Sequence, residues 1–192
     1  MTVSKRLSLL LAAGMLPSQG ALAIEPQVDK SQYNLFNPTP PRLMRELEPD
    51  RPDLTDSPFT VDAGHVQLET DLLNYTRSRP DRDKTVTEEF LFGPTEIRIG
   101  ITNSAELDLL VQPFNAVRTH FAEPIMDTWE AGPDVLEISA RFNLLGNDAF
   151  DRPGAIAVGL KPFVEVPTVR NGVGNENVEG GLVIPIAIKL AE

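Results

Sequence analysis

One stretch of sequence decides the fold: Gly181-Leu182-Val183-Ile184-Pro185-Ile186-Ala187-Ile188-Lys189-Leu190. Every second residue from Leu182 to Leu190 is leucine or isoleucine, and the residues between them are smaller or charged. A period of two is typical of a β-strand, because successive side chains point to opposite faces of a sheet. The stretch therefore predicts a strand with one strongly apolar face.

The same alternation recurs upstream. In residues 105–112 one face is apolar, with Leu107, Leu109 and Val111, and the opposite face carries Glu106, Asp108 and Gln112. We predict six such strands, at 64–76, 88–101, 105–117, 134–145, 154–167 and 180–190. Most exceed the ~5–6 residues usual in globular proteins and reach the ~9–11 residues that a tilted strand needs to cross a bilayer. The expected fold class is all-β, an antiparallel meander over residues 61–192.

Composition excludes several classes of protein. The chain has 192 residues, a formal net charge of −11 and no cysteine. Nucleic acid is not an expected partner, because its phosphates require a basic surface. A disulfide framework and thiolate metal sites are excluded by the lack of cysteine.

The first 60 residues differ from the rest. Residues 1–23 have a basic start at Lys5 and Arg6, an apolar run and the small-residue motif Ala21-Leu22-Ala23, which together predict a cleaved secretory signal peptide. Residues 24–60 hold seven prolines, and we predict an extended or irregular lead-in that lies in the periplasm. Export implies a periplasmic, secreted or outer-membrane protein.

Two arrangements explain the alternating strands. In an outer-membrane barrel the apolar faces contact lipid, and short turns at one end alternate with long loops at the other. The expected connections fit, with a short turn at 102–104 and long loops at 77–87, 118–133 and 168–179. An antiparallel sandwich, whose apolar faces pack together, would give the same alternation and remains the alternative.

Two features count against a closed barrel. Pro94, Pro113, Pro162 and Pro185 fall inside predicted strands, where proline cannot donate to a ladder. Six strands are also fewer than the eight with which bacterial barrels start. We therefore expect these residues to be the N-terminal part of a longer barrel.

The polar faces of the strands supply the candidate site. In a barrel they line the lumen, where seven acids and four bases would favour cations slightly. The short turn at 102–104 pairs Ile99 with Leu107 and Arg98 with Asp108, which predicts a cross-strand ion pair. The predicted lumen-lining residues are Glu69, Asp71, Glu96, Arg98, Glu106, Asp108, Glu137, Arg141, Lys161, Glu165 and Lys189.

Other candidate residues indicate no chemistry. Asp50, Asp53, Asp56 and Asp62 lack the ligand spacing of a calcium loop, and turn or cap roles are favoured. The only histidines, His65 and His120, lie far apart and form no metal or Ser-His-Asp pattern. We expect no catalytic residue, cofactor or metal, and so no enzyme.

Several motifs resemble a known family. They are Arg51-Pro52-Asp53-Leu54-Thr55-Asp56-Ser57-Pro58, Gly64-His65-Val66-Gln67-Leu68-Glu69, Glu96-Ile97-Arg98-Ile99-Gly100-Ile101-Thr102-Asn103 and Leu160-Lys161-Pro162-Phe163-Val164-Glu165-Val166-Pro167-Thr168. These motifs resemble the family named after the MetA pathway of phenol degradation, over residues 51–190. The resemblance implies a transporter-like barrel in the outer membrane of a Gram-negative bacterium, embedded in its lipid bilayer. It also implies passive uptake of small, aromatic or otherwise hydrophobic solutes. The alternative function is a non-transport periplasmic binding or structural module.

Overall fold

The computed structural model describes residues 28–51, 55–168, 173 and 176–190, and its fold is all-β with antiparallel strands. A single 3-10 turn, η1 at Pro41–Leu43, precedes the strands. The strands are β1 (Val66–Thr70), β2 (Leu73–Arg77), β3 (Val86–Phe92), β4 (Thr95–Thr102), β5 (Ala105–Val111), β6 (Phe114–Phe121), β7 (Met126–Gly132), β8 (Leu136–Leu145), β9 (Ile156–Val166), β10 (Glu179–Val183) and β11 (Ile186–Ile188). The predicted signal peptide, residues 1–23, lies outside the described residues.

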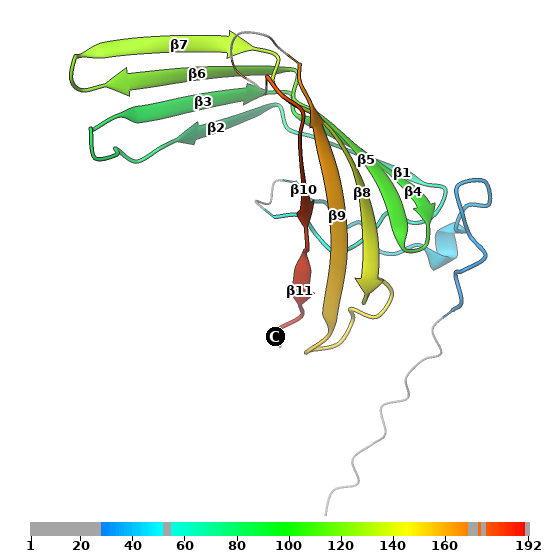
Figure 1. Cartoon of the computed structure of the whole chain (residues 1–192). Helices are drawn as coiled ribbons and strands as arrows, with labels where there is room; N and C mark the ends of the chain where they lie inside the picture. The colour runs from blue at the N-terminus through cyan, green and yellow to red at the C-terminus, as the bar shows by residue number, and fades with distance from the viewer. Residues whose placement is uncertain (1–27, 52–54, 169–172, 174–175, 191–192) are drawn as a thin grey trace, which may run out of the picture.

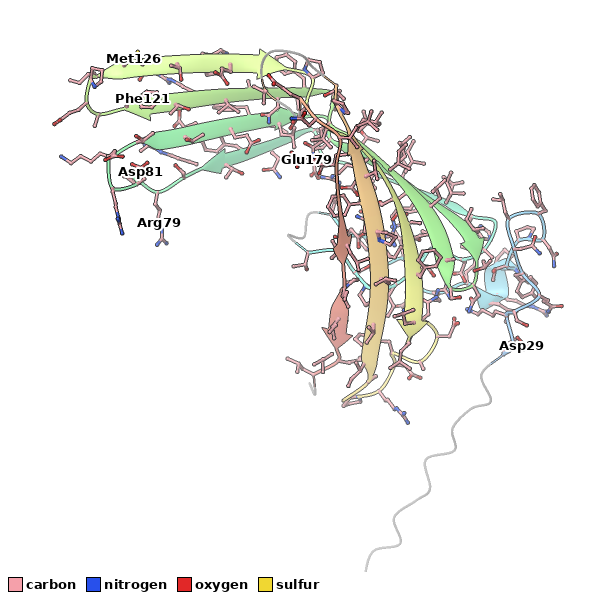
Figure 2. All side chains as sticks on the ribbon, viewed as in Figure 1. Asp29, Arg79, Asp81, Phe121, Met126 and Glu179 are labelled. Carbon is pink, nitrogen blue, oxygen red and sulfur yellow. The ribbon has the colours of Figure 1, made fainter. Side chains whose placement is uncertain are left out.

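The strands form two sheets that share long, bent runs of chain. A seven-stranded sheet has the order β1-β4-β5-β8-β9-β10, with β11 also paired to β9, and a four-stranded sheet has the order β2-β3-β6-β7. The four-stranded sheet continues from the top of the curved seven-stranded sheet and bends steeply away from it (Figure 1). Its far end carries Phe121 and Met126 (Figure 2). Four long runs, β1–β2, β3–β4, β5–β6 and β7–β8, therefore cross both sheets.

A line of prolines marks the bend between the sheets. Pro94, Pro113 and Pro133 each stand between two strands of one long run. Proline has no N–H to donate, so the ladder weakens where prolines stand side by side. Backbone bonds nevertheless cross this line, including one from Gly93 to Leu72 at 3.2 Å. The prolines predicted to interrupt strands thus lie mostly between them: Pro185 separates β10 from β11, and only Pro162 lies within a strand.

The pairing register does not change at the bend. Thr70 pairs with Thr95 below it, and Leu73 pairs with Phe92 above it, so both strands advance by three residues. The β5–β8 and β6–β7 pairs are likewise in one register. Val111 pairs with Leu136 below the bend and Asn115 with Gly132 above it, so both strands advance by four residues. With no inserted residue, the same alternation of faces runs through both sheets.

The seven-stranded sheet has one apolar and one charged face. We call the face that residues 45–51 and 55–63 cover the inner face, and the opposite one the outer face. In its described strands no charged residue lies on the outer face, where Leu68 and Ile186 are 65% and 63% exposed. Arg98 and Arg141, on the inner face, are 1% and 0% exposed. The alternation therefore reverses the usual distribution of polarity in a protein.

The four-stranded sheet mixes polar, charged and apolar residues on both faces. Its outer-face positions include Thr76, Thr119, Thr128 and the charged Glu130. The positions in register with the inner face carry a row of aromatic rings: Tyr75, Phe90, Phe92, Phe114 and Trp129. At the proline line the outer surface thus changes from one without charge to one that mixes threonine and glutamate with apolar residues such as Leu91 and Val117.

The sheet faces do not pack on one another. All contacts between described strands join neighbours within a sheet. The sandwich arrangement would have brought two apolar faces together, and the described residues contain no such layer. In the part of the chain that is described, no helix is long and apolar enough to cross a membrane.

One predicted loop is wrong. Residues 118–133 were expected to be a long loop, but β6 continues to Phe121 and β7 starts at Met126, leaving a four-residue turn. The strands there mix threonine, histidine and charge on both faces, so no apolar period of two is visible. These segments form strands because β6 and β7 pair with each other, and neither sequence alone shows a strand pattern.

Candidate functional site

The charged inner face gathers side chains from five strands. Glu69 on β1 lies opposite Glu96 on β4, and Glu106 on β5 lies opposite Arg141 on β8. Strand alternation alone places these side chains on one face, since each is two residues from the next of its strand. The result is a dense field of both signs on one surface.

All the residues predicted to line a lumen lie on this face or continue its alternation. Seven are buried: Glu69, Glu96, Arg98, Glu106, Asp108, Arg141 and Lys161. Four are partly exposed: Asp71, Glu137, Glu165 and Lys189. The structure therefore brings the whole set together, although what covers it differs from the expectation.

The predicted register at the β4–β5 turn is confirmed, but the predicted ion pair is not. Arg98 lies opposite Asp108 and Ile99 opposite Leu107, while Ala105 pairs with Thr102 because the register shifts after Gly100. The Arg98 guanidinium turns instead to Glu106, at 2.8 Å, and to Glu69, at 3.2 Å. Both carboxylates are diagonal cross-strand neighbours of Arg98, two residues from the residue directly opposite it, and a long side chain reaches them easily.

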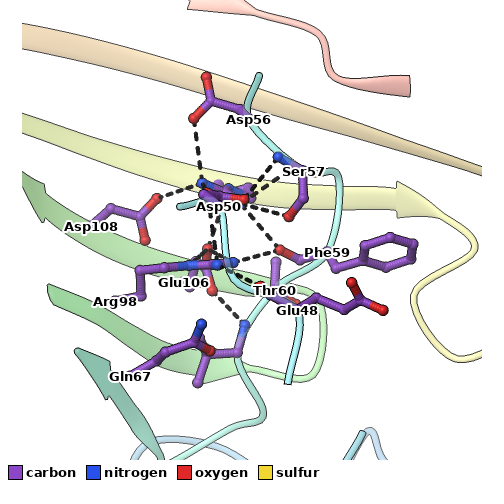
Figure 3. A network of polar contacts seen from close by, with 12 residues as sticks. Glu48, Asp50, Asp56, Ser57, Phe59, Thr60, Gln67, Arg98, Glu106 and Asp108 are labelled. Atoms are coloured by element: carbon purple, nitrogen blue, oxygen red, sulfur yellow. Dashed lines mark hydrogen bonds and ion pairs between the residues drawn. The ribbon is translucent and has the colours of Figure 1, made fainter. Parts of the chain in front are cut away.

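The chain before β1 covers this face. Residues 45–51 and 55–63, which we call the plug segment, run across the inner side of the strands (Figure 1, Figure 3). The sequence separates this proline-rich stretch from the strands as a lead-in, whereas in the structure it packs against them. An extended segment without a ladder needs partners for its backbone groups, and buried charges need partners too.

Backbone groups of the plug segment satisfy buried charges. The N–H groups of Asp50 and Arg51 both donate to Glu69 at 2.9 Å, and that of Val61 donates to Glu106. In the other direction, Arg98 donates to the carbonyls of Glu48 at 3.0 Å and Phe59 at 2.8 Å. The acids of the wall thus bind amides and its bases bind carbonyls.

Carboxylates of the plug segment pair with the bases of the wall. Asp50 accepts a hydrogen bond from Arg141, and its second charged neighbour, Arg98, lies 3.7 Å away. Asp56 accepts one from Lys161 at 2.6 Å (Figure 3 shows Asp50 and Asp56). Turn chemistry was the predicted role of these aspartates. Asp50 does accept from the Ser57 N–H at 2.9 Å, but its main partner is 91 residues away.

Two glycines let the plug segment approach the sheet closely. A Cβ at Gly100 would lie 2.6 Å from the Val61 carbonyl oxygen and closer still to that of Asp62. A Cβ at Gly159 would lie 3.0 Å from Cα of Pro58. Neither glycine has the left-handed backbone that favours this residue, so the reason for both is space.

Burial and charge act in opposite directions on the carboxylate of Asp50. Burial alone would raise its pKa, but the hydrogen bond from Arg141 and the charges of Arg141 and Arg98 outweigh it and lower the pKa. Asp148, in the loop after β8, follows the same pattern, since Asn103, Lys30 and Arg45 overcome its burial and lower its pKa. Both groups are therefore held as anions.

One buried carboxylate of the wall lacks hydrogen bonds. Neither oxygen of Asp108 has a hydrogen-bond partner among the described residues, and its nearest cation is Arg141 at 3.6 Å. The Ser139 hydroxyl beside it also lacks a partner there. Both side chains are at most 4% exposed. These groups mark the part of the inner face that the plug segment covers without bonding.

A cavity of about 580 Å³ lies between the plug segment and the lower end of the sheet. Its walls include Leu47, Phe59, Val61, Gln67, Phe150 and Lys189. Phe59 and Phe150 meet edge to face with their ring centres 4.9 Å apart. The plug segment thus leaves a cavity unfilled beside the loop that follows β8.

The other candidate residues do not converge. His65 bonds to the Thr39 carbonyl at 2.7 Å, whereas His120 lies on the other sheet beside Asp127. Trp129 belongs to β7 and not to a loop. No group of three or more His, Asp or Glu in the described residues is arranged to hold a metal ion.

Comparison with known proteins adds no relative. No protein-family model, no characterised protein and no solved structure matches this chain. The functional argument therefore rests on the residues and their geometry.

Proposed function

We propose that this protein is part of the wall of an outer-membrane channel that takes up small, aromatic or otherwise hydrophobic solutes passively. One observation carries the proposal: the outer face of the seven-stranded sheet has no charged residue in its described strands, while the inner face is charged and buried. Lipid-facing and lumen-facing residues alternate in this way in membrane barrels. The residues before Ile24 and the family resemblance support export to the outer membrane.

The change of polarity along single strands supports the same orientation. The outer face carries Leu107 and Leu109 on β5 below the bend, whereas above it Thr119 on β6 and Glu130 on β7 lie on this face. A bilayer with its surface near Pro113 would contact the apolar part and leave the polar part in water. A water-soluble protein would have to expose this broad apolar face, which is rare in monomers.

The bilayer orientation is tested with a matched pair of substitutions on one strand run. Leu107→Arg places a charge on the apolar part of the outer face, and Thr119→Arg places the same charge beyond the bend. We expect Leu107→Arg to destabilise the membrane-inserted protein by about 2–4 kcal/mol and Thr119→Arg by at most about 1 kcal/mol. Reversible denaturant unfolding in lipid vesicles measures both values.

Localisation is tested in parallel. The protein should sediment with the outer membrane and run anomalously on gels unless heated. Recovery as a soluble periplasmic protein, or equal effects of the two arginines, would overturn the proposal and favour a periplasmic module.

A further inference from the structure

We infer that the plug segment closes the polar interior and that its release from Arg141 and Lys161 opens the path for solute. This inference rests on the proposed function, because it assigns a gate to the same channel. The segment lies across β1, β4, β5, β8 and β9, and it reaches the carboxylates and bases of all five strands.

The contacts that hold the plug segment are mainly polar, apart from the ring of Phe59 against Phe150. Its carbonyls accept from Arg98, Arg141 and Asn143, and its aspartates pair with Arg141 and Lys161. Its buried apolar side chains, in the part of the chain that is described, are Pro58, Phe59 and Ala63. Polar groups that leave such contacts can bond to water instead, whereas an apolar side chain that leaves a core exposes its surface to water. A segment held in this way can be displaced more easily than one held by a hydrophobic core.

Both ends of the plug segment are attached by contacts that do not involve Asp50 or Asp56. At the end near β1, the N–H of Gly64 donates to the Gly100 carbonyl at 2.8 Å, and that of Gly100 donates to His65 at 3.0 Å. At the other end, Arg45 donates to Asn103 and Asp148 at 2.8 and 3.0 Å. The aspartates that pair with the wall lie between these anchors. Release of Asp50 and Asp56 would therefore let the chain around these two aspartates move away from the wall while both ends stay attached.

Conductance in planar bilayers of the complete channel, to whose wall this chain belongs, tests the gate. We expect Asp50→Asn and Asp56→Asn each to raise the conductance or the open probability severalfold above the unmodified protein. Asp56 is the safer variant for folding, since its carboxylate is 26% exposed. The matched control is Asp83→Asn, at an exposed turn between β2 and β3, which should change neither value.

A reversible cross-link supplies the opposite change. The Thr60 hydroxyl of the plug segment accepts a hydrogen bond from the Asn147 side chain at 2.9 Å, and the chain has no cysteine of its own. We expect oxidation of Thr60→Cys/Asn147→Cys in the Asp56→Asn background to remove the gain in conductance and reduction to restore it. Equal conductance in every variant, oxidised or reduced, would overturn the gate while leaving the channel proposal in place.

A second readout does not depend on channel activity. Ser139→Cys places a single thiol on the covered inner face, and its reaction with a water-soluble maleimide reports exposure of that face. We expect labelling of the detergent-solubilised protein to become severalfold faster with Asp56→Asn and to stay unchanged with Asp83→Asn. If no variant conducts, the channel proposal fails, and the labelling rates still decide whether the plug segment is displaced. Equal labelling rates would overturn the inference.

Discussion

Arg141 connects the wall to the plug segment. It is fully buried on β8, bonds to Asp50 and to the Ser57 carbonyl at 3.0 Å, and lies 3.3 Å from Glu106. A buried guanidinium needs several partners because burial removes its water. Its five donors in a planar fork suit this task better than the single point charge of lysine.

Removal of this charge should destabilise the fold strongly. We expect Arg141→Met to lower the free energy of unfolding by about 3–5 kcal/mol, because it leaves buried carboxylates without their cation. Arg118→Met is the matched control, since the Arg118 side chain is 41% exposed and its pair with Asp127 should contribute less than about 1 kcal/mol. Denaturant unfolding compares the two. Similar losses for both would mean that the buried network does not hold the fold.

At the scale of elements, the prolines and glycines have separate roles. Pro94, Pro113 and Pro133 form the line where the long strand runs bend. Gly100 and Gly159 sit on the inner face, where their missing side chains leave space for the plug segment. Sheet shape and plug contact thus depend on different residues.

Gly100→Ala tests the close contact between sheet and plug segment. The new methyl group would overlap the carbonyl oxygens of Val61 and Asp62. We expect a loss of about 1–3 kcal/mol of unfolding free energy, as in other overpacked sites. Gly132→Ala on β7 is the control, because nothing lies within 4 Å of its Cβ, and it should be neutral or slightly stabilising. Thermal or denaturant unfolding that ranks the two alike would contradict the contact.

At the scale of the whole molecule, acidic residues outnumber basic ones, and buried acidic side chains also hold parts of the fold together. The chain carries a net charge of −11, yet four of its buried carboxylates pair with Arg98 or Arg141: Asp50, Glu69, Glu106 and Asp108. Their partners come from strands and from the segment before them. The attachment of the plug segment should therefore depend on pH.

Acid should weaken the attachment. The pKa values of Asp50 and Asp148 are lowered from 3.8 in the folded protein. A carboxyl group whose pKa is lowered in the folded protein stabilises the fold at pH values above its ordinary pKa. This stability is lost as the pH falls through the lowered pKa. We expect the denaturant concentration at the midpoint of unfolding to decrease when the pH is lowered below about 4. Asp50→Asn/Asp148→Asn should start from a lower midpoint and lose less of it in acid. An acid loss as large as that of the unmodified protein would exclude these two groups as its cause.

Much of the strand architecture could be predicted from sequence. The alternation around Leu107 and Ile186 located strands and faces, and turn geometry set the register of Ile99 with Leu107. The strands of 118–133 were missed because their polarity has no period of two. The partner of Arg98 was missed because a long guanidinium can choose among several nearby carboxylates.

The sequence by itself determined which side chains share a face, since strand alternation depends only on neighbouring residues. Only the tertiary structure decided what covers the charged face. The contact of Asp50 with Arg141 spans 91 residues, and that of Asp56 with Lys161 spans 105. Such contacts form when separate strands come together in a sheet, and no local pattern in an extended, proline-rich segment encodes them. The outer face was readable from its repeat, whereas the plug segment followed from the charge and space that the assembled sheet provides.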